Sequence, residues 1–259
     1  MVTDVSPALP PSHFIERADG VKLAYRNHNA RRNQPTLVFL PGYMSDMQGG
    51  KATALFDWAV SAGQSILLLD YAGCGESEGN FRDGTLESWR DDVLAVIDAV
   101  LAPGTPLLVV GSSMGGWLML LVALARPQQV KGLVGIAAAP DFTDWGFDEE
   151  QKAGFRAGQT LEEHSDYSDE PYLTTAAFWQ SGEANLLLDD EIPFDGPVRL
   201  LHGQADPDVP WEVSLTLAHA LRSSDVQTRL IKDGDHRLSR PEDIAILTAT
   251  VADMMHLIG

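Results

Sequence analysis

The clearest change of hydrophobic pattern in the chain lies within residues 107–125. Leu107 to Val110 form a short continuous apolar run after a stretch rich in proline and glycine, which is typical of a buried strand in a parallel sheet. Residues 117–125 form a longer apolar segment of good helix formers, ending at Arg126 and Pro127. The pattern therefore predicts a strand, a sharp turn and a buried helix.

Short apolar runs alternate with segments of helical period along most of the chain. Two strand-like runs joined by Asp19-Gly20 predict a hairpin over residues 13–27. Strands alternating with helices imply crossover connections, so we predict an α/β fold: one domain with a mostly parallel sheet and helices on both faces. Further strands are predicted at 36–40, 65–69, 130–139, 197–203 and 226–231, and helices at 50–62, 86–100, 211–221 and 241–257.

The chain changes character between Asp141 and Asp190. This stretch holds 13 acidic residues against two basic ones, Lys152 and Arg156, with aromatic residues scattered among them. The pattern indicates a helical cap inserted over a pocket, and a decorative insertion is the alternative. In a cap, the aromatic side chains would line a site for an apolar group. The candidates for substrate binding are Trp145, Phe147, Phe178 and Trp179.

Composition excludes several classes of partner. The 18 Lys and Arg residues against 37 Asp and Glu give a net charge of −19, which disfavours nucleic acids and anionic membranes as partners. The single cysteine, Cys74, rules out an internal disulfide framework and a cysteine-rich metal site. No apolar run approaches a membrane-spanning length, and the first 15 residues lack Arg and Lys, so we expect no membrane insertion, no import sequence and a cytoplasmic protein.

A G-x-S-x-G motif with Ser113 at its centre occupies the turn within residues 107–125. A serine in a strained strand-to-helix turn presents its Oγ above the sheet, and the close approach of the chain leaves room only for Gly111 and Gly115. The helix that follows directs its N-terminal amides at the same point, so the N–H of Met114 is a candidate oxyanion donor. A glycine-rich turn without chemistry is the alternative, and the position between strand and helix favours a nucleophile.

A nucleophilic serine needs a base within hydrogen-bond reach, and the base needs a carboxylate to orient it. In sheets with this motif the acid and then the base follow the serine, on loops at the carboxyl ends of strands. His236 stands in the loop directly after residues 226–231 and is the favoured base. His219 and His256 lie within predicted helices and are the alternatives.

Three aspartates compete for the role of the acid. Asp206 precedes Pro207 in a tight turn after the strand at 197–203, which suits a carboxylate aimed at an imidazole. Asp208 fits a turn or helix-capping role better, and Asp141 at the start of the acidic stretch is the reserve choice. We expect the second oxyanion donor from the loop after residues 36–40, where the N–H of Tyr43 is favoured over a plain strand-ending turn.

These motifs together resemble the α/β-hydrolase superfamily over nearly the whole chain. Within it, the sequence is similar to the mitochondrial palmitoyl-protein thioesterase and acyl-glucuronide esterase group. The resemblance implies an α/β-hydrolase fold with Ser113 as nucleophile, Asp206 as acid and His236 as base, and hydrolysis of a small-molecule acyl ester or thioester. The segments that carry it are FLPGYMSDMQGGKA, DYAGCGES, GSSMGGWLML, RLLHGQADPDVPW and DHR.

Other chemistries are less well supported by the sequence. The Gly73-Cys74-Gly75 turn has Glu78 where a dinucleotide-binding loop needs its third glycine. The histidines show no metal-ligand spacing, and His202 is expected to support the loop of Asp206. We therefore predict no metal and no cofactor. The alternatives are a non-catalytic small-molecule-binding protein on the same fold, and C–C bond hydrolysis or haloperoxidase chemistry with the same triad.

Overall fold

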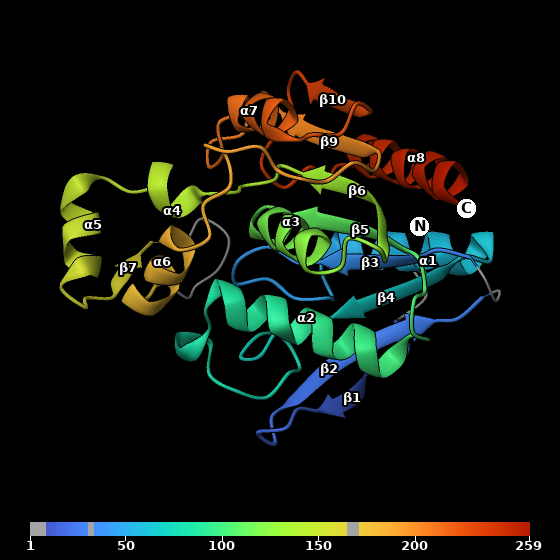
Figure 1. The fold of residues 1–259 in the computed structure, drawn as a ribbon, viewed down its shortest axis with the longest axis horizontal. Helices are drawn as coiled ribbons and strands as arrows, with labels where there is room; N and C mark the ends of the chain where they lie inside the picture. The colour runs from blue at the N-terminus through green and yellow to red at the C-terminus, as the bar shows by residue number, and fades with distance from the viewer. Residues whose placement is uncertain (1–8, 31–33, 165–170) are drawn as a thin grey trace, which may run out of the picture.

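The computed structural model describes residues 9–30, 34–164 and 171–259, and its largest element is an eight-stranded sheet (Figure 1). The strand order is β1-β2-β4-β3-β5-β6-β9-β10. β1 pairs antiparallel with β2 and β2 antiparallel with β4, whereas every pairing from β4 to β10 is parallel. The strands are β1 (His13–Glu16), β2 (Lys22–His28), β3 (Thr36–Leu40), β4 (Ser65–Leu69), β5 (Leu107–Ser112), β6 (Val130–Ile136), β9 (Val198–Gly203) and β10 (Val226–Ile231).

Most of the predicted elements are confirmed at their predicted positions. β3, β4, β10 and the helix at 50–62 begin and end at the predicted residues. β6 ends at Ile136 instead of Ala139, because Ala137 has a φ of 44° and this left-handed conformation cannot continue a strand. β3 and β4 are strongly apolar runs that are buried at every position, whereas β10 alternates apolar and polar residues as an edge strand does.

Helices cover both faces of the sheet (Figure 1). Leu37 and Phe39 of β3 belong to the core beneath α1 and α8, whereas Val38 and Leu40 belong to the core beneath α2, α3 and α7. Successive side chains of a strand point to opposite faces, so a strand buried on both faces is apolar at every position. The helices are α1 (Gly50–Ala62), α2 (Leu86–Val100), α3 (Met114–Ala125), α7 (Glu212–Ala220) and α8 (Pro241–Ile258). Over the described ranges, no helix is both long and apolar enough to cross a lipid bilayer.

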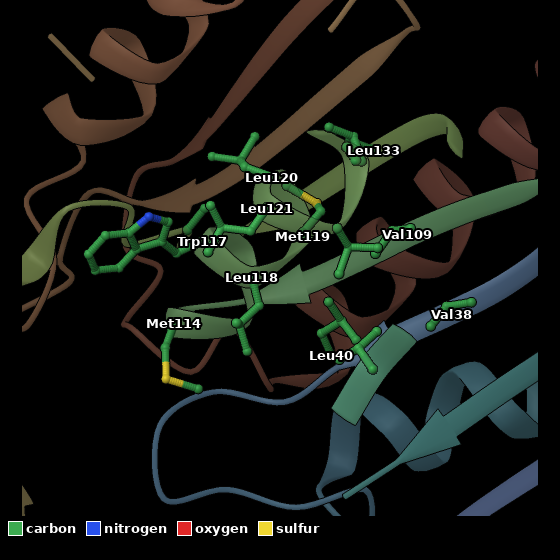
Figure 2. Close-up of a cluster of buried hydrophobic side chains, with 14 of the residues drawn as sticks. Val38, Leu40, Val109, Met114, Trp117, Leu118, Met119, Leu120, Leu121 and Leu133 are labelled. Carbon is green, nitrogen blue, oxygen red and sulfur yellow. The ribbon is translucent and has the colours of Figure 1, made fainter. Parts of the chain in front are cut away.

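The helix α3 is buried from Met114 to Ala123. Figure 2 shows its side chains packed with Val38 and Leu40 of β3 and with Val109 of β5. A helix that is apolar on all sides can only be stable inside the molecule. Its first turn is consequently fixed against the sheet, at the position where the serine motif enters the helix.

A separate group of elements lies between β6 and β9, beside the carboxyl ends of the parallel strands (Figure 1). Both of its ends meet at Asp141, whose carboxylate accepts hydrogen bonds from the N–H groups of Leu187 and Leu188 at 2.7–2.9 Å. Residues 165–170 of this inserted segment lie outside the described residues. Its elements are α4 (Phe142–Trp145), α5 (Glu149–Arg156), β7 (Leu161–Glu163), β8 (Tyr172–Thr174) and α6 (Ala176–Glu183).

Candidate active site

The turn between β5 and α3 holds Ser113 in an unfavourable backbone conformation, with a φ of 54°. A Cβ atom on Gly111 would lie 2.1 Å from the oxygen of Gly115, and one on Gly115 would lie 2.2 Å from the oxygen of Leu40. Both positions thus require glycine, for the reason that the motif predicted. A strained residue of this kind costs about 1–3 kcal/mol and persists only where its surroundings hold it.

The side chains of Ser113, His236 and Asp206 form one hydrogen-bonded line. The Nε2 atom of His236 lies 3.1 Å from Oγ of Ser113, and its Nδ1 atom lies 2.9 Å from Oδ2 of Asp206. The three residues follow β5, β10 and β9, whose carboxyl ends share one edge of the sheet. A carboxylate can only accept, so Nδ1 of His236 carries the proton and Nε2 is left to accept the serine proton.

The carboxylate of Asp206 is completely buried and has four N–H neighbours. Oδ2 faces Nδ1 of His236 and, at 3.2 Å, Nε2 of His202, while Oδ1 accepts from the main-chain N–H groups of Asp208 and Val209 at 2.9 Å. Burial raises the pKa of Asp206, but the hydrogen bonds from His202 and His236 outweigh it and hold this pKa well below its usual value. The group that orients His236 is therefore a carboxylate at neutral pH.

His202 holds the Asp206 loop in place, as expected from its position at the end of β9. Its Nε2 atom faces the carbonyl of Val209 at 3.0 Å as well as Asp206, and its Nδ1 atom faces Oγ of Ser214 at 2.7 Å. Two acceptors at Nε2 require an N–H there, and the Ser214 hydroxyl occupies the other ring nitrogen. Sequence reasoning missed Ser214, because a serine inside a predicted helix carries no local signal for this role.

The loop after β3 passes directly over the nucleophile. A Cβ atom on Gly42 would lie 3.3 Å from the Cβ of Ser113. The next residue, Tyr43, lines two cavities together with Ser113, and Met114 lines one of them. The loop is anchored to the sheet by Tyr71, which follows β4 and whose hydroxyl donates to the carbonyl of Pro41 at 2.9 Å. The structure thus brings the predicted oxyanion residues to the serine, and the roles of their N–H groups stay predictions.

Asp70 holds the far end of this loop. Its buried carboxylate accepts from the N–H groups of Met47 and Glu76 at 2.7 and 2.9 Å. Burial raises the pKa of Asp70 to about 6, although these two hydrogen bonds oppose the shift. Neither Asp70 nor Tyr71 was identified from the sequence, where Asp70 is only the residue that closes the strand at 65–69.

Comparison with known proteins identifies the family. The family described as serine aminopeptidase, S33 matches residues 31–153. Human mitochondrial palmitoyl-protein thioesterase ABHD10 is 40% identical over 246 residues, covering 93% of this chain and 79% of the relative. This chain belongs to the ABHD10 family of α/β-hydrolases. Among solved structures, mouse ABHD10 is 37% identical with a TM-score of 0.88, covering 96% of this chain and 100% of that one. A putative hydrolase from Agrobacterium vitis is 38% identical with a TM-score of 0.87, covering 95% and 98%.

Membership of the ABHD10 family confirms the α/β-hydrolase fold and the expectation of an enzyme that hydrolyses esters or thioesters. It also overrules the alternative of a non-catalytic binding protein. One expectation is wrong: the ABHD10 relatives are named mitochondrial, which contradicts a cytoplasmic location. Net charge and hydropathy describe how a folded chain is solvated, and they do not specify the compartment to which it is delivered.

An aromatic cavity of about 320 Å³ opens beside Ser113 and His236 in this ABHD10-family enzyme. Trp145 and Phe147 line it, as the sequence suggested. Phe142 and Tyr172 line it too, and they were not selected because aromatic residues are frequent throughout the inserted segment. Rings of this kind form an apolar surface within reach of the nucleophile.

Phe178 and Trp179 are corrections to the predicted lining. Neither is among the described residues around the aromatic cavity. Phe178 is buried against Tyr43, and Trp179 stacks on Phe155 at 5.6 Å between ring centroids while its indole N–H donates to the carbonyl of Thr143. On the short helix α6 these two side chains face the protein, so they stabilise the inserted segment and do not line this cavity.

Ser113 also lines a second, more polar cavity of about 230 Å³, on the side of the loop that follows β3. Its walls include Lys51, Arg237 and Ser45. Burial lowers the pKa of Lys51 to about 8, and its ammonium group donates to the carbonyl of Arg237. The nucleophile therefore lies between an aromatic compartment and a polar one.

The sequence left four other candidates, Asp141, Asp208, His219 and His256. Asp141 binds the two ends of the inserted segment, and His219 and His256 are exposed on α7 and α8. Asp208 is exposed, and with Asp206 and His236 it forms a group whose ligand atoms lie within 4.8 Å of one another. Because Nδ1 of His236 and Oδ2 of Asp206 already bind each other, we assign this group no metal.

Proposed function

We propose that this ABHD10-family hydrolase works through an acyl-enzyme formed on Ser113. The supporting observation is the hydrogen-bonded line from Asp206 through His236 to Ser113, with N···O distances of 2.9 and 3.1 Å. Oγ of Ser113 attacks the acyl carbonyl while its proton passes to Nε2 of His236. Asp206 stabilises the imidazolium that results.

The N–H groups of Tyr43 and Met114 hold the oxyanion of the tetrahedral intermediate. His236 then returns the proton to the departing alcohol oxygen or thiol sulfur, and the carbonyl re-forms as the acyl-enzyme. A water molecule, deprotonated by the same imidazole, attacks this ester, and the acid leaves as Ser113 regains its proton. No other group has to gain or lose a proton over the cycle.

The substrate we propose carries an apolar acyl group. The aromatic cavity lined by Trp145, Phe147 and Tyr172 accepts this group, and the polar cavity on the other side of Ser113 accepts the leaving alcohol or thiol. The name of the human relative, palmitoyl-protein thioesterase, supports an acyl thioester among the substrates. We also propose that residues 1–259 form one catalytic domain, with 141–190 as a cap inserted into it.

The test combines labelling with turnover. Wild-type protein should react with a fluorophosphonate probe at Ser113 and hydrolyse p-nitrophenyl esters and acyl thioesters, with turnover rising from acetyl to octanoyl groups. Ser113→Ala should abolish labelling and lower turnover by about 10⁴-fold or more, because a triad member's loss removes nearly all that the triad supplies. Full turnover by the Ser113→Ala variant would refute the mechanism.

A further inference from the structure

The side chain of Tyr43 connects the loop over the nucleophile to the inserted segment. Its hydroxyl donates to the carbonyl of Leu173 in β8 at 2.6 Å, between residues 130 positions apart in the chain. Its ring packs at 4.8–6.1 Å between centroids against five other rings. Three of these belong to the inserted segment and two to the body: Phe142, Tyr172, Phe178, Phe81 and Trp89.

This hydrogen bond, which we call the Tyr43 latch, is buried at both ends. Burial raises the pKa of the Tyr43 hydroxyl far above its usual value, so the group remains a donor at every pH at which the enzyme works. A buried carbonyl without a partner is unfavourable, and the latch therefore holds one geometry. Movement of β8 relative to the sheet would be transmitted to Tyr43.

The same loop is fixed to the sheet on either side of Tyr43. The Tyr71 hydroxyl binds the carbonyl of Pro41, and Asp70 binds the N–H of Met47. Gly42 lies between these anchors and against the Cβ of Ser113. The sheet thus fixes the ends of the loop, and the latch supplies the third attachment, at the residue whose N–H is the proposed oxyanion donor.

We propose that the Tyr43 latch is a positioning device for the chemical step: by fastening the loop to β8, the phenol sets where the main-chain N–H of Tyr43 stands relative to the oxyanion. This inference rests on the proposed function, since the oxyanion forms only if Ser113 attacks. Oxyanion donors act within a narrow range of distances, so a displaced loop weakens binding of the transition state more than binding of the substrate.

The test compares two variants that each remove one hydroxyl group between the body and the inserted segment. Tyr43→Phe removes the latch and keeps the ring. Ser181→Ala removes a hydroxyl of α6 that accepts from the N–H of Leu86 and donates to the carboxylate of Glu87, away from the loop. We expect Tyr43→Phe to lower kcat for an octanoyl ester by about 10- to 100-fold with KM within about twofold, and Ser181→Ala to leave kcat within about twofold. Equal kcat losses in the two variants, or a kcat near wild type for Tyr43→Phe, would overturn the proposal.

Two further measurements complete the test. Replacing Tyr43 by 4-aminophenylalanine restores a donor and should recover most of the lost kcat, whereas no recovery would contradict the latch. In wild-type protein, an alkyl trifluoromethyl ketone, which forms a hemiketal oxyanion, should slow amide exchange in β8 more than the matching methyl ketone does, because coupling is reciprocal. Equal protection by the two ketones would contradict the latch without any variant having to fold.

Fluorophosphonate labelling separates the two possible failures. A Tyr43→Phe protein that is labelled at Ser113 and turns over at the wild-type rate disproves the latch alone. A wild-type protein that is not labelled disproves the acyl-enzyme mechanism, and the latch with it.

Discussion

Replacing Asp206 by Asn tests the geometry of the site most directly, because it removes a charge and changes the shape very little. The carboxylate accepts from four N–H groups, two on each oxygen. If the Asn oxygen keeps the two main-chain N–H groups, its NH₂ faces His236 and His202. Nδ1 of His236 must then lose its proton and accept from the amide, so the proton moves to Nε2, where it faces Ser113 and blocks proton transfer.

The expected loss is large. A histidine held in the wrong tautomer lowers kcat by about 10⁴-fold, which corresponds to about 5.5 kcal/mol of transition-state stabilisation. In the other orientation the Asn oxygen faces His236, and the NH₂ opposes the N–H groups of Asp208 and Val209. That orientation opens the loop, which costs about 1–3 kcal/mol for each group left without a partner.

The assay is hydrolysis of a p-nitrophenyl ester at pH 7, with thermal unfolding measured in parallel. Asp195→Asn is the matched control, because this exposed aspartate pairs with Arg222 and should retain activity within about twofold. The depressed pKa of Asp206 gives a second expectation. The ionised carboxylate stabilises the folded protein fully at pH values above its pKa in the unfolded chain, about 4. This stabilisation is lost only as the pH falls towards the lower pKa of Asp206 in the folded protein. A kcat of Asp206→Asn within about tenfold of wild type would refute the tautomer argument.

Three further predictions concern stability and specificity. The pKa of Asp70 is raised to about 6, so the folded state binds a proton that the unfolded state releases between about pH 4 and 6. The contribution of Asp70 to the free energy of unfolding should therefore decrease by roughly 3 kcal/mol as the pH rises through that window. Urea-unfolding profiles of wild type and Asp70→Asn should diverge by about this amount, and parallel profiles would contradict the assignment. A Cβ on Gly115 would meet a main-chain oxygen at 2.2 Å, so Gly115→Ala should unfold at a markedly lower temperature than wild type. Gly50→Ala is the control, because the new atom would have open space around it and the melting temperature should not change. Equal melting temperatures for the two variants would disprove the close approach at Gly115. Trp145 lines the aromatic cavity, so Trp145→Ala should reduce kcat/KM for octanoyl esters more than for acetyl esters. Trp179 is buried, so Trp179→Ala should lose about 3–5 kcal/mol of stability without changing the chain-length preference. The reverse pattern would exchange the roles of the two tryptophans.

The predicted site residues that the structure brings together are those with a strong local signal in the sequence. Gly111 and Gly115 report a steric requirement that no other residue satisfies. The loop of Asp206 follows the mostly buried strand β9, and the loop of His236 follows the edge strand β10. The carboxyl ends of the parallel strands lie at one edge of the sheet, so the strand order brings these loops together. Chemistry fixed by main-chain approach can thus be predicted from residue type and spacing.

The parts that were missed depend on which way a side chain points. Aromatic residues fill the inserted segment, and sequence alone could not separate Trp145, which lines the cavity, from Trp179, which packs on Phe155. Ser214 and Tyr71 act through contacts with residues distant in the chain. The predicted cytoplasmic location was wrong for a different reason. Transport machinery recognises a targeting signal, and the physical chemistry of folding does not determine the compartment.

The arrangement around Asp141 bears on how such enzymes diversify. The inserted segment leaves the sheet and returns to it at a single carboxylate, which binds the N–H groups of Leu187 and Leu188. Whatever stands between these two points can lengthen, shorten or be exchanged without altering the strand order on which the nucleophile depends. Selection can therefore reshape substrate range in one interval of the gene, as long as β8 still offers Tyr43 the carbonyl of Leu173.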